Sequence, residues 1–254
     1  MALLHCTFFG PSIQKMSGLD VIVPEGQGRG PFPVLYLLHG LSDDQTVWQR
    51  RTSIERYVEG LPLIVAMPDG HRSFYVNGPP DSAALAYEDH IVKDVAGFVD
   101  ATFTTLRRRE GRALAGLSMG GYGAVMLALR HPHRYCAAAS HSGALRFAHV
   151  TDGPTEHWRF LLGEQTTGGP YDCVRLAGEV VARKDRPALR FDCGREDFLI
   201  QHNRLFHRAL KRLGYPCIYK EYPGAHTWEY WDLHIRESIA FVLRHLKTPP
   251  RKGK

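Results

Sequence analysis

The sequence predicts a doubly wound α/β fold, in which a mostly parallel sheet carries helices on both faces. Apolar runs of strand length alternate with helical segments along the chain, which is the pattern of consecutive β-α units. These runs are almost continuously apolar, as in strands that are covered on both faces. A chain of 254 residues can bury one large core, so we expect a single domain over 1–248.

The first elements predict the edge of the sheet. Residues 3–9 and 19–23 read as two short strands that form an antiparallel N-terminal ribbon. The apolar run at 32–38 then predicts the first parallel strand, which ends at His39-Gly40. A helix is expected from about 44 to 59, followed by a buried strand at 61–67.

The middle of the chain continues the alternation and then interrupts it. Apolar residues recur every three or four positions between Tyr87 and Phe103, which predicts a helix with one buried face. A strand over 112–117 leads into a helix that ends near His131-Pro132, because a proline disfavours helical geometry in the preceding residue. A strand follows at 135–141. Residues 144–186 are rich in turns around one helix at about 173–183, and we interpret them as a small inserted flap.

The last part of the chain returns to the regular pattern. We expect strands at 187–193 and 217–222, with a helix from about 201 to 213 between them and a terminal helix that reaches Leu246. The basic residues of 249–254 follow two prolines and read as a disordered tail.

Composition limits the class of protein. Apolar residues at 44% and charged residues at 23% exclude a fibrous or disordered chain, and no apolar run approaches the roughly 20 residues of a membrane span. The N-terminus shows no secretory pattern, and the five widely spaced cysteines include no CxxC pair, so we expect reduced thiols and a cytoplasmic protein without a metal or organic cofactor. The net charge is +6, but the sequence has no stretch in which basic and aromatic residues alternate, as nucleic-acid-binding surfaces often do. This argues against a nucleic-acid partner.

One motif carries most of the functional information. Gly116, Ser118 and Gly120 form a G-x-S-x-G pattern between a strand-length and a helix-length apolar run. Such a sharp strand-to-helix turn exposes the serine hydroxyl at the carboxyl edge of the sheet and places the Met119 N–H at a helix start, where developing negative charge is favoured. The pattern predicts a serine nucleophile for acyl transfer. Ser142, in a Ser-His-Ser-Gly segment, is a weaker alternative because it lacks the turn and the helix.

A serine nucleophile needs a base and an acid, which follow it in the order acid, then histidine, in this type of active site. His226 lies in a Pro-Gly-Ala-His turn before the terminal helix, whereas most other late histidines lie inside predicted helices. Asp197 lies in a glycine-containing loop after the 187–193 strand, and Asp192 and Glu196 remain alternatives for the acid.

The remaining site predictions concern the surroundings of the serine. An oxyanion hole needs a second amide beside that of Met119, and the loop after the His39-Gly40 strand, through Leu41, is the usual donor. Gly40 permits the tight turn there. Aromatic residues are candidates for lining a substrate pocket, although such residues more often belong to the core; they are Trp48, Phe74, Tyr75, Tyr122 and Trp228.

These segments together resemble the esterase D family of α/β-hydrolases, which includes S-formylglutathione hydrolases, tributyrin, acetyl and feruloyl esterases and, more distantly, mycolyltransferases. The likeness covers nearly the whole chain and rests on Leu37-Leu-His-Gly40, Trp48 to Arg56, Arg72-Ser-Phe-Tyr75, Gly116 to Tyr122, Cys193 to Phe198 and Gly224 to Trp231. It implies an α/β-hydrolase fold, a Ser118–Asp197–His226 triad and an oxyanion hole at Leu41 and Met119. The Trp-Glu-Tyr-Trp stretch after His226 is more similar to the tributyrin and acetyl esterase branch than to the S-formylglutathione hydrolases.

The sequence therefore predicts a serine carboxylesterase for small-molecule esters with short acyl chains. The alternatives are a thioesterase or acyltransferase that uses the same triad, and, from another class, a non-catalytic binding protein with this fold. The natural ester stays open, as does the oligomeric state, with a homo-oligomer as one option.

Overall fold

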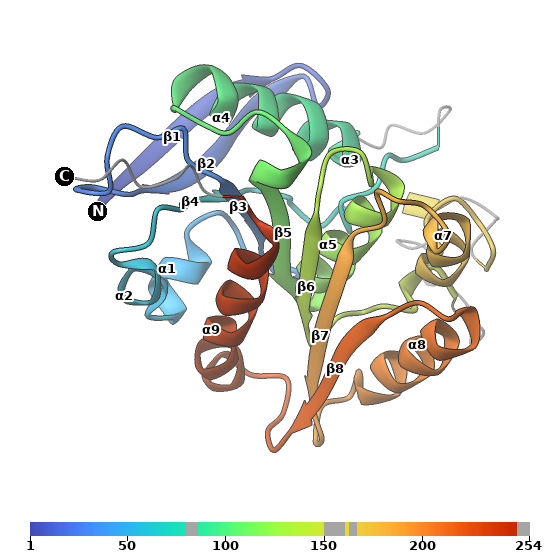
Figure 1. Ribbon diagram of the computed structural model, residues 1–254. Coiled ribbons are helices and arrows are strands. Elements are labelled where there is room, and N and C mark those ends of the chain that lie inside the picture. Colours follow the sequence, from blue (N-terminus) through green and yellow to red (C-terminus); the bar gives the residue numbers. More distant parts are fainter. Residues whose placement is uncertain (80–85, 150–160, 163–166, 248–254) are drawn as a thin grey trace.

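A single mixed sheet runs through the molecule. The computed structural model describes residues 1–79, 86–149, 161–162 and 167–247. In these residues the strands form one eight-stranded sheet in the order β1-β2-β4-β3-β5-β6-β7-β8 (Figure 1). The strands are β1 (Ala2–Gly10), β2 (Lys15–Val23), β3 (Val34–Leu38), β4 (Ile64–Pro68), β5 (Arg112–Leu117), β6 (Ala137–His141), β7 (Ala188–Gly194) and β8 (Cys217–Tyr222).

Helices connect these strands. The α-helices are α1 (Val47–Arg51), α2 (Ile54–Val58), α3 (Tyr87–Asp89), α4 (Ala96–Thr102), α5 (Ser118–Arg130), α7 (Cys173–Val180), α8 (Ile200–Leu213) and α9 (Trp228–His245). A π-helical segment, η1 (His90–Val95), joins α3 to α4, and two short 3-10 turns are η2 (Arg109–Gly111) and η3 (Phe147–His149).

The strand directions confirm the predicted fold class. β4, β3, β5, β6, β7 and β8 are parallel, whereas β1 and β2 pair antiparallel with each other and β2 pairs antiparallel with β4. The chain passes from β3 outward to β4 and then back across to β5, so the strand order reverses beside β3. In open α/β sheets ligands bind beyond the carboxyl ends of the strands at such a reversal.

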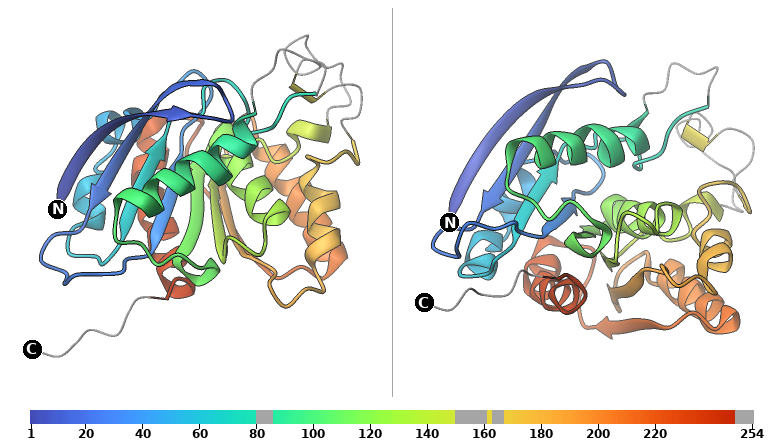
Figure 2. Two further views of the ribbon diagram at one scale, coloured as in Figure 1. Left: turned by 90° about the horizontal axis from the view of Figure 1, so that it is seen from above. Right: turned by 45° about the horizontal axis from the view of Figure 1, so that its top comes forward.

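Two helical layers cover the sheet (Figures 1 and 2). One face packs against the α3-η1-α4 segment, α5, α7 and α8, and the other packs against α1, α2 and α9. The strands between them are fully covered: every residue of β3, β4 and β5 is buried. This explains the continuous apolar runs in the sequence, since neither face of these strands meets water.

The prediction of one helix over about 44–59 was wrong. The structure has two five-residue helices, α1 and α2, separated at Thr52, whose backbone is extended (φ −137°, ψ 168°). The Thr52 hydroxyl donates to the Trp48 carbonyl, and the Ser53 N–H donates to Asp232 of α9 at 2.7 Å. The Trp48 carbonyl still accepts the Thr52 N–H at 3.1 Å, as in a helix. The Ser53 N–H, which a continuous helix would pair with a backbone carbonyl, is instead bonded to a side chain from the far end of the chain.

The helix predicted between Tyr87 and Phe103 is present with a local difference. Its middle, η1, is π-helical, and there His90 is fully buried. The His90 ring contacts Asp94 at 3.0 Å and the Ser17 hydroxyl of β2 at 3.2 Å. The π-helical segment thus coincides with a polar contact between this helix and strand β2.

Two predicted segments lie partly or wholly outside the described residues. Of the flap at about 144–186, η3 and α7 are described, whereas 150–160 and 163–166 are not. The basic tail at 249–254 also lies outside them.

Candidate active site

Ser118 occupies the sharp turn between β5 and α5. Its φ of +51° is in the left-handed region, which non-glycine residues seldom adopt and in which residues of active sites are often found. The turn brings the helix start against the end of β3, so that a Cβ on Gly120 would overlap the Leu38 carbonyl oxygen. Only glycine fits there, and the result is a half-buried serine at the carboxyl edge of the sheet.

His226 reaches Ser118 from the β8–α9 loop. Its Nε2 lies 3.0 Å from the Ser118 hydroxyl oxygen, although the two residues are 108 positions apart. The ring contacts two aromatic side chains. The distance between ring centroids is 4.5 Å to Phe198 and 4.8 Å to Trp231, whose ring is perpendicular to that of His226. With 18% of its side chain exposed, His226 remains accessible from solvent.

Asp197 completes the chain of contacts from the β7–α8 loop. The His226 Nδ1 lies 2.9 Å and 3.1 Å from its two carboxylate oxygens, and the Leu199 N–H donates to it at 2.7 Å. Burial acts to raise the pKa of Asp197, but the hydrogen bonds from His226, Ser142 and Leu199 outweigh it, and the net pKa lies below the usual value. The carboxylate is therefore ionised at neutral pH, and Nδ1 of His226 carries the proton.

The loops that carry Asp197 and His226 are bonded to each other. The Arg195 N–H donates to the Tyr222 carbonyl at 2.8 Å, and the Glu196 N–H donates to the Gly224 carbonyl at 3.1 Å. The Glu196 carboxylate accepts the Gly224 N–H at 2.6 Å, and a Cβ on Gly194 would overlap Gly224. Glu196, an alternative acid from the sequence, thus joins the two loops instead of contacting the histidine.

The second alternative acid, Asp192, belongs to a separate polar cluster that is fully buried. Its Oδ1 lies 3.0 Å from His141 Nδ1 and accepts the Tyr230 hydroxyl at 2.8 Å, and its Oδ2 pairs with Arg190. The Nε2 of His141 lies 2.8 Å from the Ser238 hydroxyl. Asp192 therefore contacts a different histidine, deep between the sheet and α9.

The predicted oxyanion residues flank Ser118. Met119 is the second residue of α5, where backbone amides at the helix start are free of helical partners. A Cβ built on Gly40 would lie 3.8 Å from the Ser118 Cβ, which places the loop after β3 beside the serine. His39 Nε2 accepts the Gly70 N–H at 2.8 Å, so its Nδ1–H donates to the Gly40 carbonyl at 2.7 Å. Because C=O and N–H point in opposite directions in one peptide unit, the Leu41 N–H points away from His39.

The aromatic candidates for a substrate pocket lie mainly in the core. Trp48 and Tyr122 are fully buried and donate to the backbone carbonyls of Leu38 and Tyr171 at 3.2 Å and 2.9 Å. Phe74 and Tyr75 are buried as well. This placement does not support substrate contact by these four side chains, because they present almost no surface. Trp228 is half-buried and stands edge-on to Trp231, with 5.1 Å between the ring centroids.

Sequence analysis did not predict the positions of three residues near the triad. Phe198 is 74% exposed beside His226 and follows Asp197 directly, so adjacency to the predicted acid could have identified it. Trp231 contacts both His226 and the Ser142 hydroxyl, the latter at 3.2 Å. Ser142, considered as a rival nucleophile, is fully buried. The contacts of Ser142 and Trp231 join distant segments and leave no local sequence signal.

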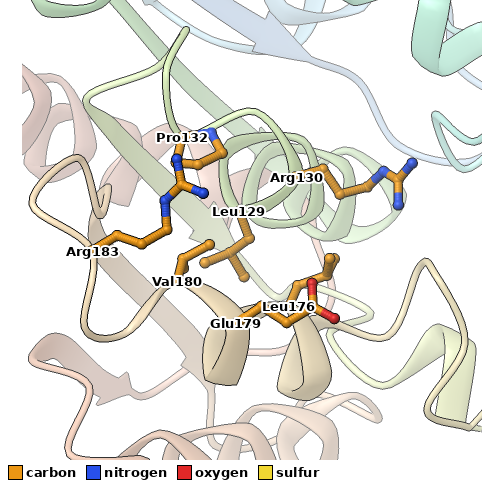
Figure 3. Close-up of a pocket in the computed structure, with 7 residues that line it drawn as sticks. All are labelled: Leu129, Arg130, Pro132, Leu176, Glu179, Val180 and Arg183. Atoms are coloured by element: carbon orange, nitrogen blue, oxygen red, sulfur yellow. The ribbon is translucent and has the colours of Figure 1, made fainter.

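A cavity of about 230 Å³ lies away from these residues, between the C-terminal end of α5 and α7 (Figure 3). Figure 3 shows the apolar side chains of Leu129, Leu176 and Val180 grouped between Arg130 and Arg183. Leu129 is 11 residues past Ser118, or about 17 Å along the helix at 1.5 Å per residue. The cavity is therefore separate from the serine.

Within the described residues, no cluster of three or more histidine, cysteine or acidic side chains is arranged to hold a metal ion. In the same part of the chain no helix has the length and apolar character that crossing a membrane requires.

Comparison with known proteins agrees with this geometry. The family model described as "Putative esterase" matches residues 10–241. An acetyl esterase of Caldicellulosiruptor saccharolyticus is 25% identical over 96% of this chain and 99% of its own length. Among solved structures, the substrate-bound fluorophosphonate-binding serine hydrolase FphF of Staphylococcus aureus has a TM-score of 0.87 at 32% identity, covering 95% of this chain and 98% of that one. The S-formylglutathione hydrolase FrmB of the same organism has a TM-score of 0.83 at 31% identity, with 95% and 98% covered.

The family model covers most of the chain, the sheet matches α/β-hydrolase neighbours, and a serine, a histidine and an aspartate meet at the carboxyl edge of that sheet. The chain therefore belongs to the esterase family and is a serine carboxylic ester hydrolase of the α/β-hydrolase fold.

Proposed function

We propose that the chain hydrolyses short-chain acyl esters through an acyl-enzyme, with Ser118 as the nucleophile, His226 as the general base and Asp197 as the acid that orients the histidine. The observation that carries the proposal is the continuous hydrogen-bond chain from Asp197 through Nδ1 and Nε2 of His226 to the Ser118 hydroxyl. A serine hydroxyl is a weak nucleophile, and this arrangement supplies the base that it needs.

In the first half of the reaction, the Ser118 oxygen attacks the ester carbonyl carbon while its proton moves to Nε2 of His226. The carbonyl oxygen becomes an oxyanion, and the bond to the alcohol then breaks as His226 returns the proton to the leaving oxygen. In the second half a water molecule gives a proton to His226, attacks the acyl carbon and releases the acid. Ser118 regains its proton, so the enzyme ends unchanged.

Asp197 acts on His226 in this scheme. Because Nδ1–H of His226 donates to the carboxylate, Nε2 is left free to accept the serine proton. The low pKa of Asp197 keeps it ionised while His226 is positively charged, which stabilises the imidazolium.

The oxyanion hole in this proposal consists of the Leu41 and Met119 N–H groups. The contact of His39 with the Gly40 carbonyl supports it, since it fixes the peptide unit that carries the Leu41 amide. Losing one such donor in comparable sites costs about 3 kcal/mol of transition-state stabilisation. Gly40 lets the loop approach Ser118 closely, and Trp228 is retained as a substrate-side residue because part of its ring is exposed.

The acyl class is the finer part of the proposal. The similarity to an acetyl esterase supports a small acyl group as the substrate of this chain. The similarity to FrmB, an S-formylglutathione hydrolase, supports a thioester as the alternative substrate. An acyltransferase would use the same triad with an alcohol in place of water. We also propose that residues 1–248 form one catalytic domain. We further propose a reducing, cytoplasmic setting, which is supported by the five free cysteines.

The test is a substrate panel run on the wild type and on Ser118→Ala. We expect the wild type to hydrolyse p-nitrophenyl acetate and butyrate faster than longer esters, feruloyl esters or acyl thiols, and to be labelled by a fluorophosphonate. Wild-type protein that is folded yet inert to every ester and to the probe would favour the non-catalytic binding protein. Acyl thiols as the best substrates would favour the thioesterase.

A further inference from the structure

Ser142 has a strained backbone at the end of β6. Its φ is +47°, in the left-handed region that non-glycine residues seldom adopt, and its side chain is fully buried. The Ser142 N–H donates to the Asp192 carbonyl at 2.8 Å, which fixes this turn to the neighbouring strand β7. Strain of this kind persists where surrounding contacts determine the conformation.

The hydroxyl of Ser142 has a defined direction. The indole N–H of Trp231 lies 3.2 Å from the Ser142 oxygen, and an indole nitrogen can only donate. The serine oxygen therefore accepts from Trp231, and the serine proton is left for another acceptor. Both the Asp197 carboxylate and the Cys193 sulfur are within its reach.

The carboxylate is the better acceptor of the two. Burial raises the pKa of the Cys193 thiol well above its usual range, so Cys193 stays uncharged. Asp197 is ionised, and hydrogen bonds to an ionised acceptor are about twice as strong as neutral ones. The Asp197 carboxylate, which already receives the N–H groups of His226 and Leu199, is therefore the favoured acceptor for the Ser142 proton.

We propose that Ser142 is a positioning residue for Asp197, and that Trp231, Ser142, Asp197, His226 and Ser118 form one directed hydrogen-bond chain. Trp231 has two contacts in this chain, because its N–H orients the Ser142 hydroxyl while its ring packs perpendicular to the His226 ring. The inference rests on the proposed function, since Asp197 needs an orienting partner only if it in turn orients a working base.

The central test is Ser142→Ala, with kcat, KM and the pH profile of ester hydrolysis measured together. We expect kcat to fall about 10-fold to 100-fold, as for the loss of one hydrogen bond to a charged group, with KM unchanged. The acid limb of the kcat/KM profile should move to higher pH, because the Asp197–His226 pair binds its shared proton more tightly when the carboxylate has one donor fewer. Among the titratable groups around Asp197, His226 is bonded to it, Cys193 stays uncharged, and Glu196, the adjacent residue, accepts the Gly224 N–H instead.

Ser140→Ala is the matched control. Ser140 lies on the same strand, is also fully buried, and its hydroxyl has no hydrogen-bond partner among the residues that the structure describes. Removing that hydroxyl should leave kcat and the pH profile at their wild-type values. A loss equal to that of Ser142→Ala would show that any small cavity beside the site has the same effect, which would overturn the proposal.

Two further variants separate the hydroxyl from the backbone. Ser142→Gly also lacks the hydroxyl but removes the strain of the positive φ, so it should lose as much kcat as Ser142→Ala while unfolding at a higher temperature. Trp231→Phe keeps a ring and removes the N–H, and we expect a smaller loss of about 3-fold. In the double variant with Ser142→Ala the losses should not multiply, because the N–H then has no hydroxyl to orient.

The outcomes distinguish this proposal from the proposed function. Loss of activity in Ser118→Ala, with wild-type kcat and pH profile in folded Ser142→Ala or Ser142→Gly, would overturn the positioning role alone. Full activity in Ser118→Ala would overturn the triad itself. If Ser142→Ala does not fold, Ser142→Gly and Trp231→Phe decide, and unchanged kcat and pH profiles in both would overturn the proposal.

Discussion

The described residues contain three Ser–His–Asp chains. One passes through His90 and links Asp94 to Ser17 of β2. The other two, through His226 (the first) and His141 (the second), have nearly the same geometry. In the first, His226 lies 3.0 Å from the Ser118 oxygen and 2.9 Å from Asp197. In the second, His141 lies 2.8 Å from the Ser238 oxygen and 3.0 Å from Asp192. Hydrogen-bond distances alone therefore do not identify a catalytic triad.

The surroundings of the two chains differ. Ser118 is at a helix start with free amides and is half-buried, whereas Ser238 is in the middle of α9 with no exposed surface. The backbone amides around Ser238 are paired within the helix, so no oxyanion hole can form there. Asp192 is also paired with Arg190. The second chain thus has the polar contacts of a triad without access or charge stabilisation, and we interpret it as a structural element.

The largest effect expected from this comparison is on the two serines. Ser118→Ala should reduce kcat by about 10⁴-fold to 10⁶-fold, because the nucleophile is lost and only binding and the oxyanion hole remain. Ser238→Ala should keep kcat within about 3-fold of wild type. Hydrolysis of p-nitrophenyl acetate and fluorophosphonate labelling measure both. Loss of labelling in a folded Ser238→Ala protein would contradict the assignment.

Substitution of the two aspartates, Asp197 and Asp192, should affect different properties, activity in one case and stability in the other. Asp197→Asn should reduce kcat by about 10⁴-fold, since the amide favours the wrong tautomer of His226, with little change in unfolding free energy. Asp192→Asn should instead lower the unfolding free energy by about 3 kcal/mol, because the fully buried ion pair is broken and Arg190 keeps only the partly exposed Glu237 as a charge partner. Urea denaturation and steady-state kinetics on both variants check this, and it fails if the two variants lose activity and stability in the same proportion.

A third prediction concerns acid. Burial acts to raise the pKa of Asp192, but His141 and Arg190 lower it to about 2, from a usual value of 3.8. A depressed carboxyl pKa stabilises the folded state above the unfolded pKa, and this stabilisation of about 2 kcal/mol is lost as pH falls from about 4 to about 2. Urea unfolding at several pH values in this window should show the loss in the wild type. Asp192→Asn should lack it, and parallel curves for the two proteins would contradict the prediction.

The smallest effect is expected at the exposed end of the first chain. Phe198 is 74% exposed beside His226, so its ring is available to an apolar group of the ester. Phe198→Ala should raise KM for p-nitrophenyl esters by about 3-fold, with kcat and thermal stability close to wild type. Leu233→Ala is the control, because Leu233 is also an exposed apolar residue but lies on α9. An equal KM change in that control would remove the case for a contact with substrate.

The order of strands and helices was predictable because the signals are local. Continuous apolar runs mark buried parallel strands, and the glycines around Ser118 mark a place where a strand turns directly into a helix. Asp197 and His226 could be proposed because each lies in a loop just after a strand, and parallel strands end at the same edge of the sheet. Geometry places all three together, while their catalytic roles stay a prediction.

Features that depend on distant contacts were not predictable. The break between α1 and α2 involves Asp232, and the burial of Trp48 and Tyr122 depends on which face of a helix meets the core. The contacts of Ser142 and the second Ser–His–Asp chain likewise join segments far apart in sequence. Residue type alone does not distinguish a serine that is a nucleophile from one that supports an acid.

The bonding between the β7–α8 and β8–α9 loops has a consequence for how this enzyme could change. Asp197 and His226 are carried by backbone that is joined at Tyr222 and Gly224, so we expect the proposed base and its acid to keep their positions relative to each other. Substitutions elsewhere around Ser118 can then alter which esters fit while proton transfer keeps its geometry. Substrate range can diverge in this chain without rebuilding its chemistry.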